Sequence, residues 1–355
     1  MNNIKKLEKL GFFQCYENNT DIDPNNIIAR VTEVNRSTYI IHTGEKEIIA
    51  ELTGKLMFSG SENFPVTGDF VEGLLFDNDS HAIINKIYPR KTVLSRKASG
   101  KNIEIQYIAA NINTAFIIQS LNEDFNVNRL TRYLIMVNNS KIEPVVLLSK
   151  ADLTDKPEIV IKINAIKTNY PELKIIPYSS KTNEGINEII SCFIPNKTYC
   201  LLGSSGVGKT TLINILTGNS LATKKIRESD SKGRHTTSKR QIFFLHNGSL
   251  IVDTPGMREL GNFGINNGIE KTFIDIFELS KTCKFSDCTH INEPGCAILK
   301  ALNENIINKE HYNNFIKILK EASFYDMSKI EKRQKDKEFG KMVKQIMKEK
   351  KSRKG

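Results

Sequence analysis

The stretch "LLGSSGVGKTTLIN", residues 201–214, decides the fold, because it sets a glycine-rich turn between a strand-like and a helix-like segment. Its residues 203–210 satisfy the pattern G-x-x-x-x-G-K-[ST]. Backbone N–H groups at the start of such a helix wrap phosphates, while the lysine neutralises the outer ones and the threonine ligates Mg²⁺. We therefore predict a nucleotide-binding loop made of Gly203, Ser204, Ser205, Gly206, Val207, Gly208, Lys209, Thr210 and Thr211.

A second phosphate-facing loop is predicted in "LIVDTPG", residues 250–256. The apolar run ends in Asp253, whose carboxylate can hold the hydration shell of Mg²⁺, and Gly256 offers an N–H group to the γ-phosphate. This loop follows the phosphate loop by roughly 45 residues at the end of a buried strand, as expected in a doubly wound sheet. Thr210 and Asp253 are therefore predicted to bind magnesium.

The basic stretch "SDSKGRHTTSKRQIFFL", residues 229–245, is typical of a switch segment, which becomes ordered when the γ-phosphate and Mg²⁺ bind. Thr236 or Thr237 would be a further magnesium ligand. Met257 follows "DTPG" where many GTPases keep a water-orienting glutamine, and a thioether cannot position water. His235 is therefore the candidate catalytic residue, and a solvated or partner-binding histidine is the alternative.

A base-reading loop is predicted in "VVLLSKAD", residues 145–152. The carboxylate of Asp152 can accept two hydrogen bonds from the N1–H and amine of guanine, with Lys150 stacking along the base. Ser149, also predicted to bind GTP, stands where the pattern N-K-x-D has asparagine, and its short hydroxyl makes fewer bonds. An ordinary strand-end loop is therefore the alternative. The segment "YSSKT", residues 178–182, would complete the base site through Ser179, Ser180 and Lys181. In small GTPases the phosphate loop comes first, so the order of the two loops is reversed here.

Four soft metal ligands cluster in "CKFSDCTHINEPGC", residues 283–296. In a cytosolic chain such a grouping indicates a metal before disulfides. The short spacings, with Pro294 and Gly295 to fold the loop back, suit a closed tetrahedral site. We predict one structural Zn²⁺ per chain, and reduced cysteines in a loop are the alternative. The predicted ligands are Cys283, Cys288, His290 and Cys296.

The pattern of strand-like and helix-like segments divides the 355-residue chain into three parts. Short segments rich in β-branched residues up to about residue 94 fit a small closed barrel of the oligonucleotide-binding type. Apolar strands that alternate with helical stretches then predict a parallel sheet covered on both faces. We predict a multidomain α/β protein with domains at residues 1–95, 96–279 and 280–355.

The net charge of +11 is unevenly placed, because residues 329–354 hold twelve Lys/Arg against four Asp/Glu, a net +8. Such a block attracts nucleic acid or acidic lipid, and a solvated tail is the alternative. The sequence contains neither an apolar run of about 18 residues nor a basic-then-apolar leader. We therefore expect no membrane span and a cytoplasmic location.

With these residues in place, the chain resembles the RsgA family of circularly permuted GTPases that depend on the small ribosomal subunit. The likeness covers nearly the whole sequence, through "PVTGDFV", "SKAD" ahead of "GSSGVGKTTLIN", "GRHTT", "DTPGMREL", "CTHINEPGC" and the tail segment "FGKMVK". The resemblance implies an N-terminal OB-fold β-barrel, a circularly permuted P-loop GTPase domain and a C-terminal zinc-binding helical domain. It also implies a late-assembly checkpoint that clamps the small ribosomal subunit and its rRNA, hydrolyses GTP and leaves as the GDP form. We expect a monomer.

Two other functions stay open. One is an ATP-using P-loop enzyme of metabolism, which "SKAD" and the missing substrate domain disfavour. The other is a nucleotide-gated RNA-binding module with negligible hydrolysis.

Overall fold

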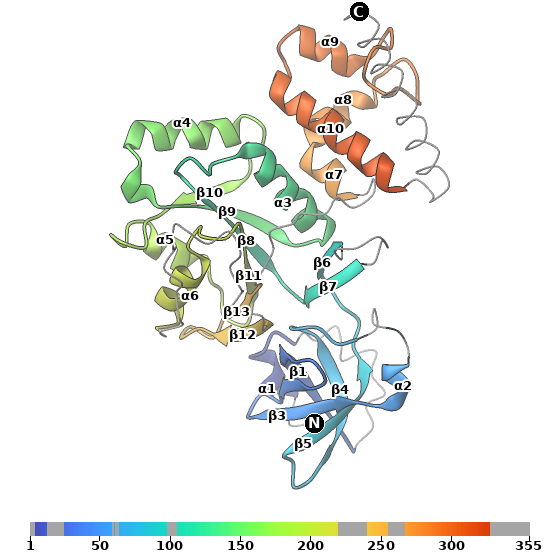
Figure 1. Cartoon of the computed structure of the whole chain (residues 1–355), viewed down its shortest axis with the longest axis vertical. Helices are drawn as coiled ribbons and strands as arrows, with labels where there is room; N and C mark the ends of the chain where they lie inside the picture. Colours follow the sequence, from blue (N-terminus) through green and yellow to red (C-terminus); the bar gives the residue numbers. More distant parts are fainter. Residues whose placement is uncertain are drawn as a thin grey trace, which may run out of the picture. The chain divides into compact units, whose positions relative to one another are not determined.

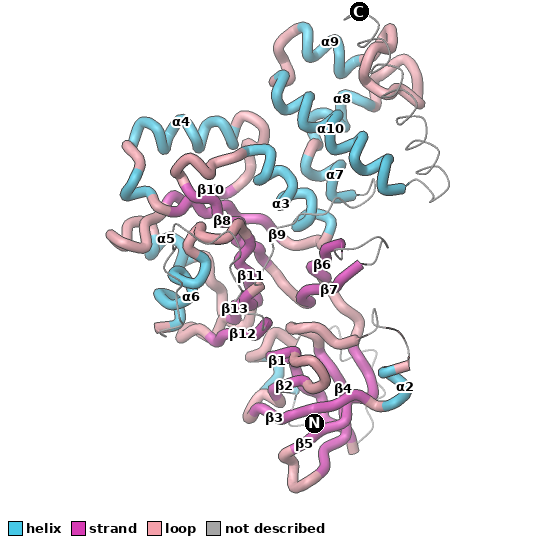
Figure 2. Tube along the Cα trace, in the orientation of Figure 1, coloured by secondary structure: helices cyan, strands magenta, loops and turns pink. Residues whose placement is uncertain are grey.

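The computed structural model of the chain describes residues 4–12, 25–58, 60, 64–97, 105–218, 240–254 and 267–326. The chain divides into two compact units, Met1–Gly261 and Asn262–Gly355 (Figure 1). All described strands lie in the first unit, whereas the described part of the second consists of helices and loops (Figure 2). No helix within these residues is long and apolar enough to cross a membrane. The three domain boundaries drawn from the sequence stay a prediction.

Five strands close a barrel near the start of the first unit. β1 pairs with β2, β2 with β3 and β4 with β5 in antiparallel fashion, β3 pairs with β5 in parallel, and β4 returns to β1. Every second residue of β3 is buried in the barrel core, as the two-residue period of a strand requires. The predicted barrel is confirmed, with strands β1 Asn26–Val34, β2 Tyr39–His42, β3 Glu47–Leu52, β4 Phe70–Phe76 and β5 His81–Ile87, and short helices α1 Ile4–Glu8 and α2 Gly54–Met57.

A hairpin of β6 Val93–Lys97 and β7 Ile105–Ala110 leads from the barrel to a second set of strands in the order β10-β9-β8-β11-β13-β12. Neighbours are parallel except for β12, which runs antiparallel to β13. Every residue of β8 and β11 is buried, as expected of central strands in a parallel sheet. The strands are β8 Thr114–Ser120, β9 Glu143–Ser149, β10 Lys174–Pro177, β11 Thr198–Leu202, β12 Arg240–Phe244 and β13 Leu250–Asp253.

Helices cover both faces of this sheet (Figure 1). Ile189 and Leu212, from α5 and α6, pack in one cluster with Phe116 and Leu147 of the central strands. Ile117, the next residue of β8, must point to the opposite face, where α3 contacts β8 and β9. The predicted doubly wound arrangement is therefore present, with helices α3 Val127–Asn139, α4 Lys156–Lys167, α5 Ile186–Ser191 and α6 Lys209–Thr217, and the 3₁₀ turn Ala151–Leu153.

The second unit packs around a small aromatic core. The rings of Phe273 and Phe315 lie 5.2 Å apart, and Ile276 and Ile298 are fully buried. The Nε2 atom of His311, itself almost buried, lies 3.3 Å from a carboxylate oxygen of Asp275. The helices are α7 Asn267–Thr272, α8 Ile274–Ser280, α9 Ala297–Asn303 and α10 Lys309–Asp326.

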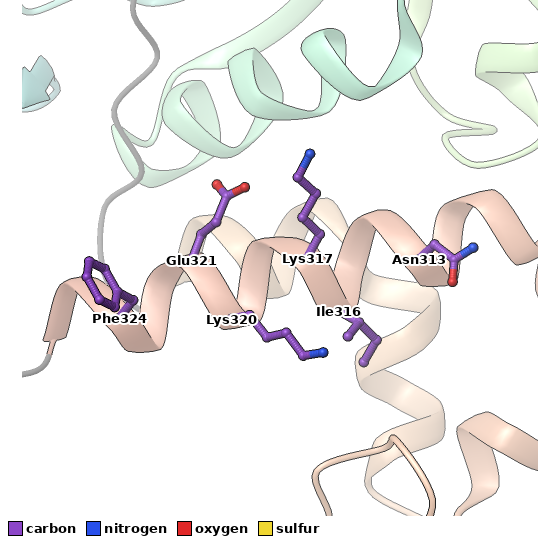
Figure 3. Close-up of a pocket in the computed structure, with 6 residues that line it drawn as sticks. All are labelled: Asn313, Ile316, Lys317, Lys320, Glu321 and Phe324. Carbon is purple, nitrogen blue, oxygen red and sulfur yellow. The ribbon is translucent and has the colours of Figure 1, made fainter. Parts of the chain in front are cut away.

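One face of α10 lines an open hollow (Figure 3). The two lysine side chains on this face point to opposite sides of the helix, and Phe324 is 41% exposed. The hollow is therefore lined by charges of both signs and by an exposed ring. The lining residues are Asn313, Ile316, Lys317, Lys320, Glu321 and Phe324.

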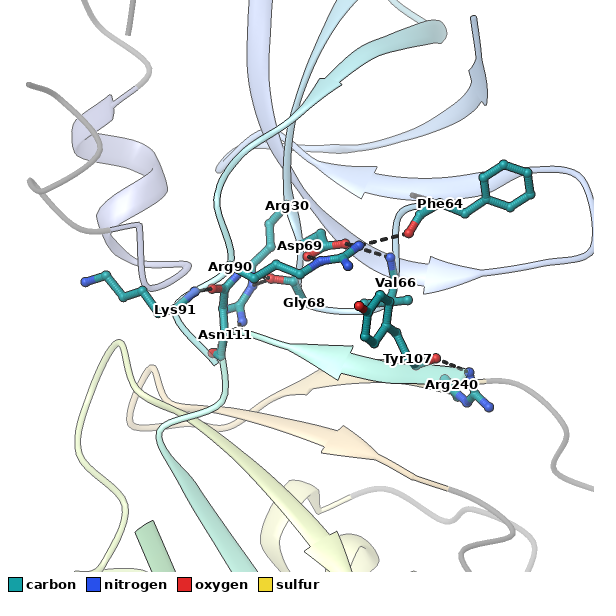
Figure 4. A network of polar contacts seen from close by, with 10 residues as sticks. All are labelled: Arg30, Phe64, Val66, Gly68, Asp69, Arg90, Lys91, Tyr107, Asn111 and Arg240. Carbon is teal, nitrogen blue, oxygen red and sulfur yellow. Dashed lines mark hydrogen bonds and ion pairs between the residues drawn. The ribbon is translucent and has the colours of Figure 1, made fainter. Parts of the chain in front are cut away.

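A buried arginine of the barrel bonds to β11 in the second set of strands. Arg30 in β1 is 1% exposed, and its guanidinium donates to the hydroxyl of Thr198, the first residue of β11, at 2.9 Å. It also donates to the carbonyl oxygens of Gly68 at 3.2 Å and Asn111 at 3.3 Å (Figure 4). A further acceptor is the carbonyl oxygen of Leu10. The charge is thus surrounded by oxygen acceptors from four separate segments, which ties the barrel to β11.

Backbone pairing and an ion pair complete this junction. β1 pairs with β12, with Val34 opposite Arg240, so that one eleven-stranded sheet runs through both parts of the unit. Arg90 grips the buried carboxylate of Asp69 at 2.7 and 2.8 Å and donates to the carbonyl of Phe64 (Figure 4). Burial raises the pKa of Asp69, and the Arg90 guanidinium opposes that rise. Such a pair stabilises only while both partners are present.

We expect Arg30→Ala to lower the free energy of unfolding of the first unit by about 2–4 kcal/mol, because it strips a charged donor from several buried acceptors. Urea unfolding, monitored by hydrogen exchange of the β1 and β11 amides, would measure the loss in the free energy of unfolding. Arg36→Ala is the matched control, since Arg36 is exposed in the β1–β2 turn and should cost less than about 0.5 kcal/mol. Equal stability of the two variants would contradict this role of Arg30.

Candidate functional site

The phosphate loop lies between β11 and α6, as the sequence predicts. Its glycines take backbone angles that side chains disfavour, with φ of 147° at Gly203, 80° at Gly206 and 99° at Gly208. A Cβ at Gly203 would lie 2.4 Å from the carbonyl oxygen of Ile118 in β8, so only glycine fits there. The start of α6 therefore presents backbone N–H groups of the kind that bind anions at helix N-termini.

Lys209 curls over this loop. Its Nζ donates to the carbonyl oxygens of Gly203 at 2.7 Å and Ser204 at 2.6 Å. Thr210 and Thr211 follow in the first turn of α6, where Thr210 is half-buried and Thr211 exposed. Ser205 and Gly206 are exposed at the tip of the loop, whereas Val207 is buried beneath it. The loop can thus surround an anion with N–H groups and one ammonium group.

Asp253 ends β13, the strand beside β11, and stands opposite Leu201 in the sheet. Burial raises the pKa of the Asp253 carboxyl group, and the charge of Lys209 lowers it. The next residue, Thr254, is buried and donates its hydroxyl to the Leu201 carbonyl at 2.6 Å. A carboxylate therefore lies at the same sheet edge as the phosphate loop, and oxygen ligands of this kind suit Mg²⁺.

The predicted base-reading residues come together after the ends of β9 and β10. Lys150 adopts the left-handed conformation at φ 63°, which turns the chain out of β9. Asp152 then accepts a hydrogen bond from the hydroxyl of Ser179 at 2.6 Å. The same hydroxyl accepts from the N–H groups of Lys181 and Thr182, both at 3.1 Å. Ser179 thus orients the carboxylate.

Ser149 and Ser180 differ in their placement. Ser149 is 2% exposed, and its hydroxyl donates to the carbonyl of Val207 in the phosphate loop at 2.8 Å. Ser180 is half-buried in the turn that follows Ser179. Several predicted functional residues lie outside the described residues. They are the candidate catalytic residue His235, the candidate magnesium ligands Thr236 and Thr237, the γ-phosphate contact Gly256 and the basic tail at 329–354.

The four predicted metal ligands converge in the second unit. The ligand atoms of Cys283, Cys288, His290 and Cys296 all lie within 4.8 Å of one another. Nδ1 of His290 is 3.7 Å from the sulfurs of Cys283 and Cys296, and these two sulfurs are 3.9 Å apart. A tetrahedron with metal–sulfur bonds of about 2.3 Å has edges of about 3.8 Å, so the spacing fits one four-coordinate ion. The cluster can hold a metal ion.

Neighbouring groups fix the ligands in place. The N–H of Ala297 points to the Cys283 sulfur at 3.4 Å. Although burial raises the pKa of Cys283, backbone N–H groups of Ala297 and Ile298 bring it below its usual value, which favours the thiolate that binds metals. Tyr312 in α10 donates its hydroxyl to the His290 carbonyl at 2.7 Å. The metal loop is thereby tied to α9 and α10.

Glu293 is a residue of this site that the sequence did not reveal. Its carboxylate accepts from the hydroxyl of Thr289 and from the N–H groups of Thr289 at 3.2 Å, Ile291 at 3.1 Å and Asn292 at 3.2 Å. These bonds, that of the Thr289 hydroxyl first, lower the pKa of Glu293 to about 2. The sequence carried no signal that separates Glu293 from Asp287, the other acid between Cys283 and Cys296. The carboxylate shapes the loop that carries Cys288 and His290.

We expect Cys288→Ser to lose about one metal ion per chain and to unfold the second unit more readily, because metal binding and folding are coupled in small sites. Elemental analysis of the purified protein would measure the loss. Cys192→Ser is the control, since Cys192 lies outside the cluster, with its sulfur on the Glu188 carbonyl at 3.3 Å. Unchanged metal content in Cys288→Ser would reject the ligand set.

Comparisons with known proteins agree with this arrangement. A family model described as "RsgA GTPase" matches residues 87–263. The "Small ribosomal subunit biogenesis GTPase RsgA 1" of Listeria innocua is 40% identical over 323 residues, which cover 90% of each chain.

Two solved structures share the fold. The YjeQ protein from Thermotoga maritima has a TM-score of 0.63 at 22% identity and covers 84% of this chain and 98% of its own. YloQ, whose structure is described as that of a circularly permuted GTPase, has a TM-score of 0.62 at 24% identity and covers 86% of this chain and 97% of its own.

Proposed function

The chain belongs to the RsgA GTPase family, and on this premise we propose that it hydrolyses GTP while bound to the small ribosomal subunit. The observation that carries the proposal is the convergence of three groups at one edge of one sheet. They are the phosphate loop, the carboxylate of Asp253 and the carboxylate of Asp152 that Ser179 orients. A relative named for small-subunit biogenesis and identical at 40% of positions supports the same partner.

The roles of the phosphate site follow from its chemistry. The N–H groups of residues 203–209 would hold the β-phosphate, and Lys209 would leave the loop carbonyls to neutralise the outer phosphates. Thr210 and Asp253 would hold Mg²⁺, with Thr236 or Thr237, and the ion would neutralise charge between the β- and γ-phosphates. We assign Gly256 to the γ-phosphate and His235 to the attacking water.

The cluster of three cysteines and one histidine is proposed to hold one structural Zn²⁺. Thiolate and imidazole ligands at tetrahedral spacing suit that ion, and four protein ligands leave no open position for catalysis. The metal would stabilise the unit that carries Lys317, Lys320 and the exposed Phe324 of α10 and, further along the chain, the basic tail. Lysines with exposed rings are suited to phosphates and bases of RNA.

The proposed cycle is a checkpoint late in subunit assembly. The protein would bind the subunit and its rRNA with GTP as a cytoplasmic monomer, and loss of the γ-phosphate would weaken its grip. We assign the barrel at 1–95 and the metal region at 280–355 to RNA, and the region at 96–279 to the nucleotide. The segment after Asp253 continues along the chain into the second unit, so a change at the γ-phosphate has a short covalent route to it.

The nucleotide-gated RNA-binding module without appreciable hydrolysis is the second candidate, because no glutamine follows "DTPG". The two functions separate in a turnover assay. We expect GTP hydrolysis to rise at least tenfold when small subunits are added, ATP hydrolysis to stay low, and Lys209→Ala to abolish the rise. Tight subunit binding with GTP but no added turnover would favour the second candidate.

We expect Asp152→Asn to lower GTP affinity at least tenfold and to improve binding of xanthosine triphosphate, because the amide donates where the carboxylate only accepted. Competition binding with both nucleotides would measure the change. Asp155→Asn is the control, since Asp155 follows the same turn but precedes α4. Identical base preference in the two variants would show that Asp152 does not read the base.

A further inference from the structure

The hydroxyl of Ser149 joins the base-reading loop to the phosphate loop. Ser149 is the last residue of β9 and is 2% exposed. Its Oγ donates to the carbonyl of Val207 at 2.8 Å and lies 3.3 Å from the carbonyl of Gln119 at the end of β8. The shorter distance assigns the proton to Val207, 58 residues away in the chain. The bond spans two loops that would enclose a nucleotide from different sides.

A hydroxyl has one proton to give, and this limits what Ser149 can do. Both of its carbonyl neighbours are acceptors, so the proton is used within the protein. The N7 atom of guanine is also an acceptor and is read only by a donor. An asparagine at this position would carry two N–H protons, enough for one carbonyl and N7 together. The serine has none left for the base.

Tyr178 covers Ser149 from the neighbouring loop. The N–H of Tyr178 donates to the carbonyl of Leu148, the residue before Ser149, at 2.8 Å, and the Tyr178 side chain is fully buried. The Tyr178 hydroxyl also lies 3.9 Å from the position of a Cβ on Gly208 in the phosphate loop. The Tyr178 carbonyl accepts the N–H of Ala151 at 3.1 Å. Ser149 is thus enclosed where the phosphate loop and both base-reading loops meet.

We propose that Ser149 is a positioning residue that holds the phosphate loop through Val207 and makes no bond to guanine. Recognition of the base then depends on its N1–H and amine edge at Asp152, and position 149 contributes nothing at N7. This inference rests on the proposed function, because it assumes that Asp152 reads guanine.

Binding of GTP and 7-deaza-GTP, in which a C–H group replaces N7, tests the inference on the full chain. We expect the two affinities of the wild-type protein to agree within about threefold. A preference for GTP of tenfold or more that disappears in Ser149→Ala would overturn the proposal, because the serine would then bond N7. A preference that persists in Ser149→Ala assigns N7 to another group and leaves Ser149 as a positioning residue.

Ser149→Ala should lower the affinities for GTP and 7-deaza-GTP equally, by about fivefold to tenfold, since it removes one buried hydrogen bond from the phosphate loop. Ser149→Thr keeps the hydroxyl and should recover most of that loss, which a mere packing defect would not allow. If Ser149→Ala does not fold, Ser149→Cys, whose thiol is only a weak donor, takes its place in the comparison of the two affinities.

Inosine triphosphate, which lacks the exocyclic amine, keeps the inference separate from the proposed function. Loss of affinity for it in the wild-type protein supports guanine reading at Asp152. Equal binding of GTP, inosine triphosphate and ATP would refute the proposed function itself, whatever the 7-deaza-GTP result.

Discussion

The parallel pairing of β9, β8 and β11 is the constraint on which the rest of the nucleotide site depends. Ser120 stands opposite Ser149, and Ile117 stands opposite Leu202, so the three strands end near one sheet edge. Loops that follow parallel strands meet on the same side wherever they come in the chain. The base-reading loop can therefore precede the phosphate loop without moving away from it. The reversed order changes the connections and preserves the site.

The reversed order does change what is attached to the sheet. β12, at the edge of the nucleotide strands, pairs with β1 of the barrel, and Arg30 reaches past it to Thr198 at the start of β11. If the barrel moved relative to the sheet, the backbone hydrogen bonds between β1 and β12 would break. The buried guanidinium of Arg30 would also lose its acceptor on Thr198. The barrel is therefore a rigid extension of the nucleotide sheet. In the proposed cycle, a nucleotide-dependent change would therefore arise in loops at the ends of the parallel strands and not at this junction.

Local signals explain which features could be predicted from the sequence. The phosphate loop and the metal cluster each lie within a short window, and the barrel has the two-residue period of its strands. The Arg30–Thr198 bond joins residues 168 positions apart, and no local pattern indicates it. From the sequence, Ser149 was predicted to be a weakened contact to the base, because its bond to Val207 is visible only in three dimensions. Glu293 could not be separated from Asp287, the other acid within the cluster, until the loop was seen to aim its N–H groups at one carboxylate.

The segment 283–296, which carries the four candidate metal ligands, contacts both α9 and α10 in the second unit. Cys296 is both a candidate ligand and the N-cap of α9, where its sulfur accepts from the N–H of Leu299 at 3.5 Å. His290 takes a left-handed backbone angle of 62°, and its carbonyl is held by Tyr312 of α10. Without a cation, the three cysteine sulfurs, which lie within 4.8 Å of one another, would repel as they ionise to thiolates. Loss of the metal would therefore loosen the start of α9 and the contact with α10 together, so that the helical unit and its ligand set fold as one.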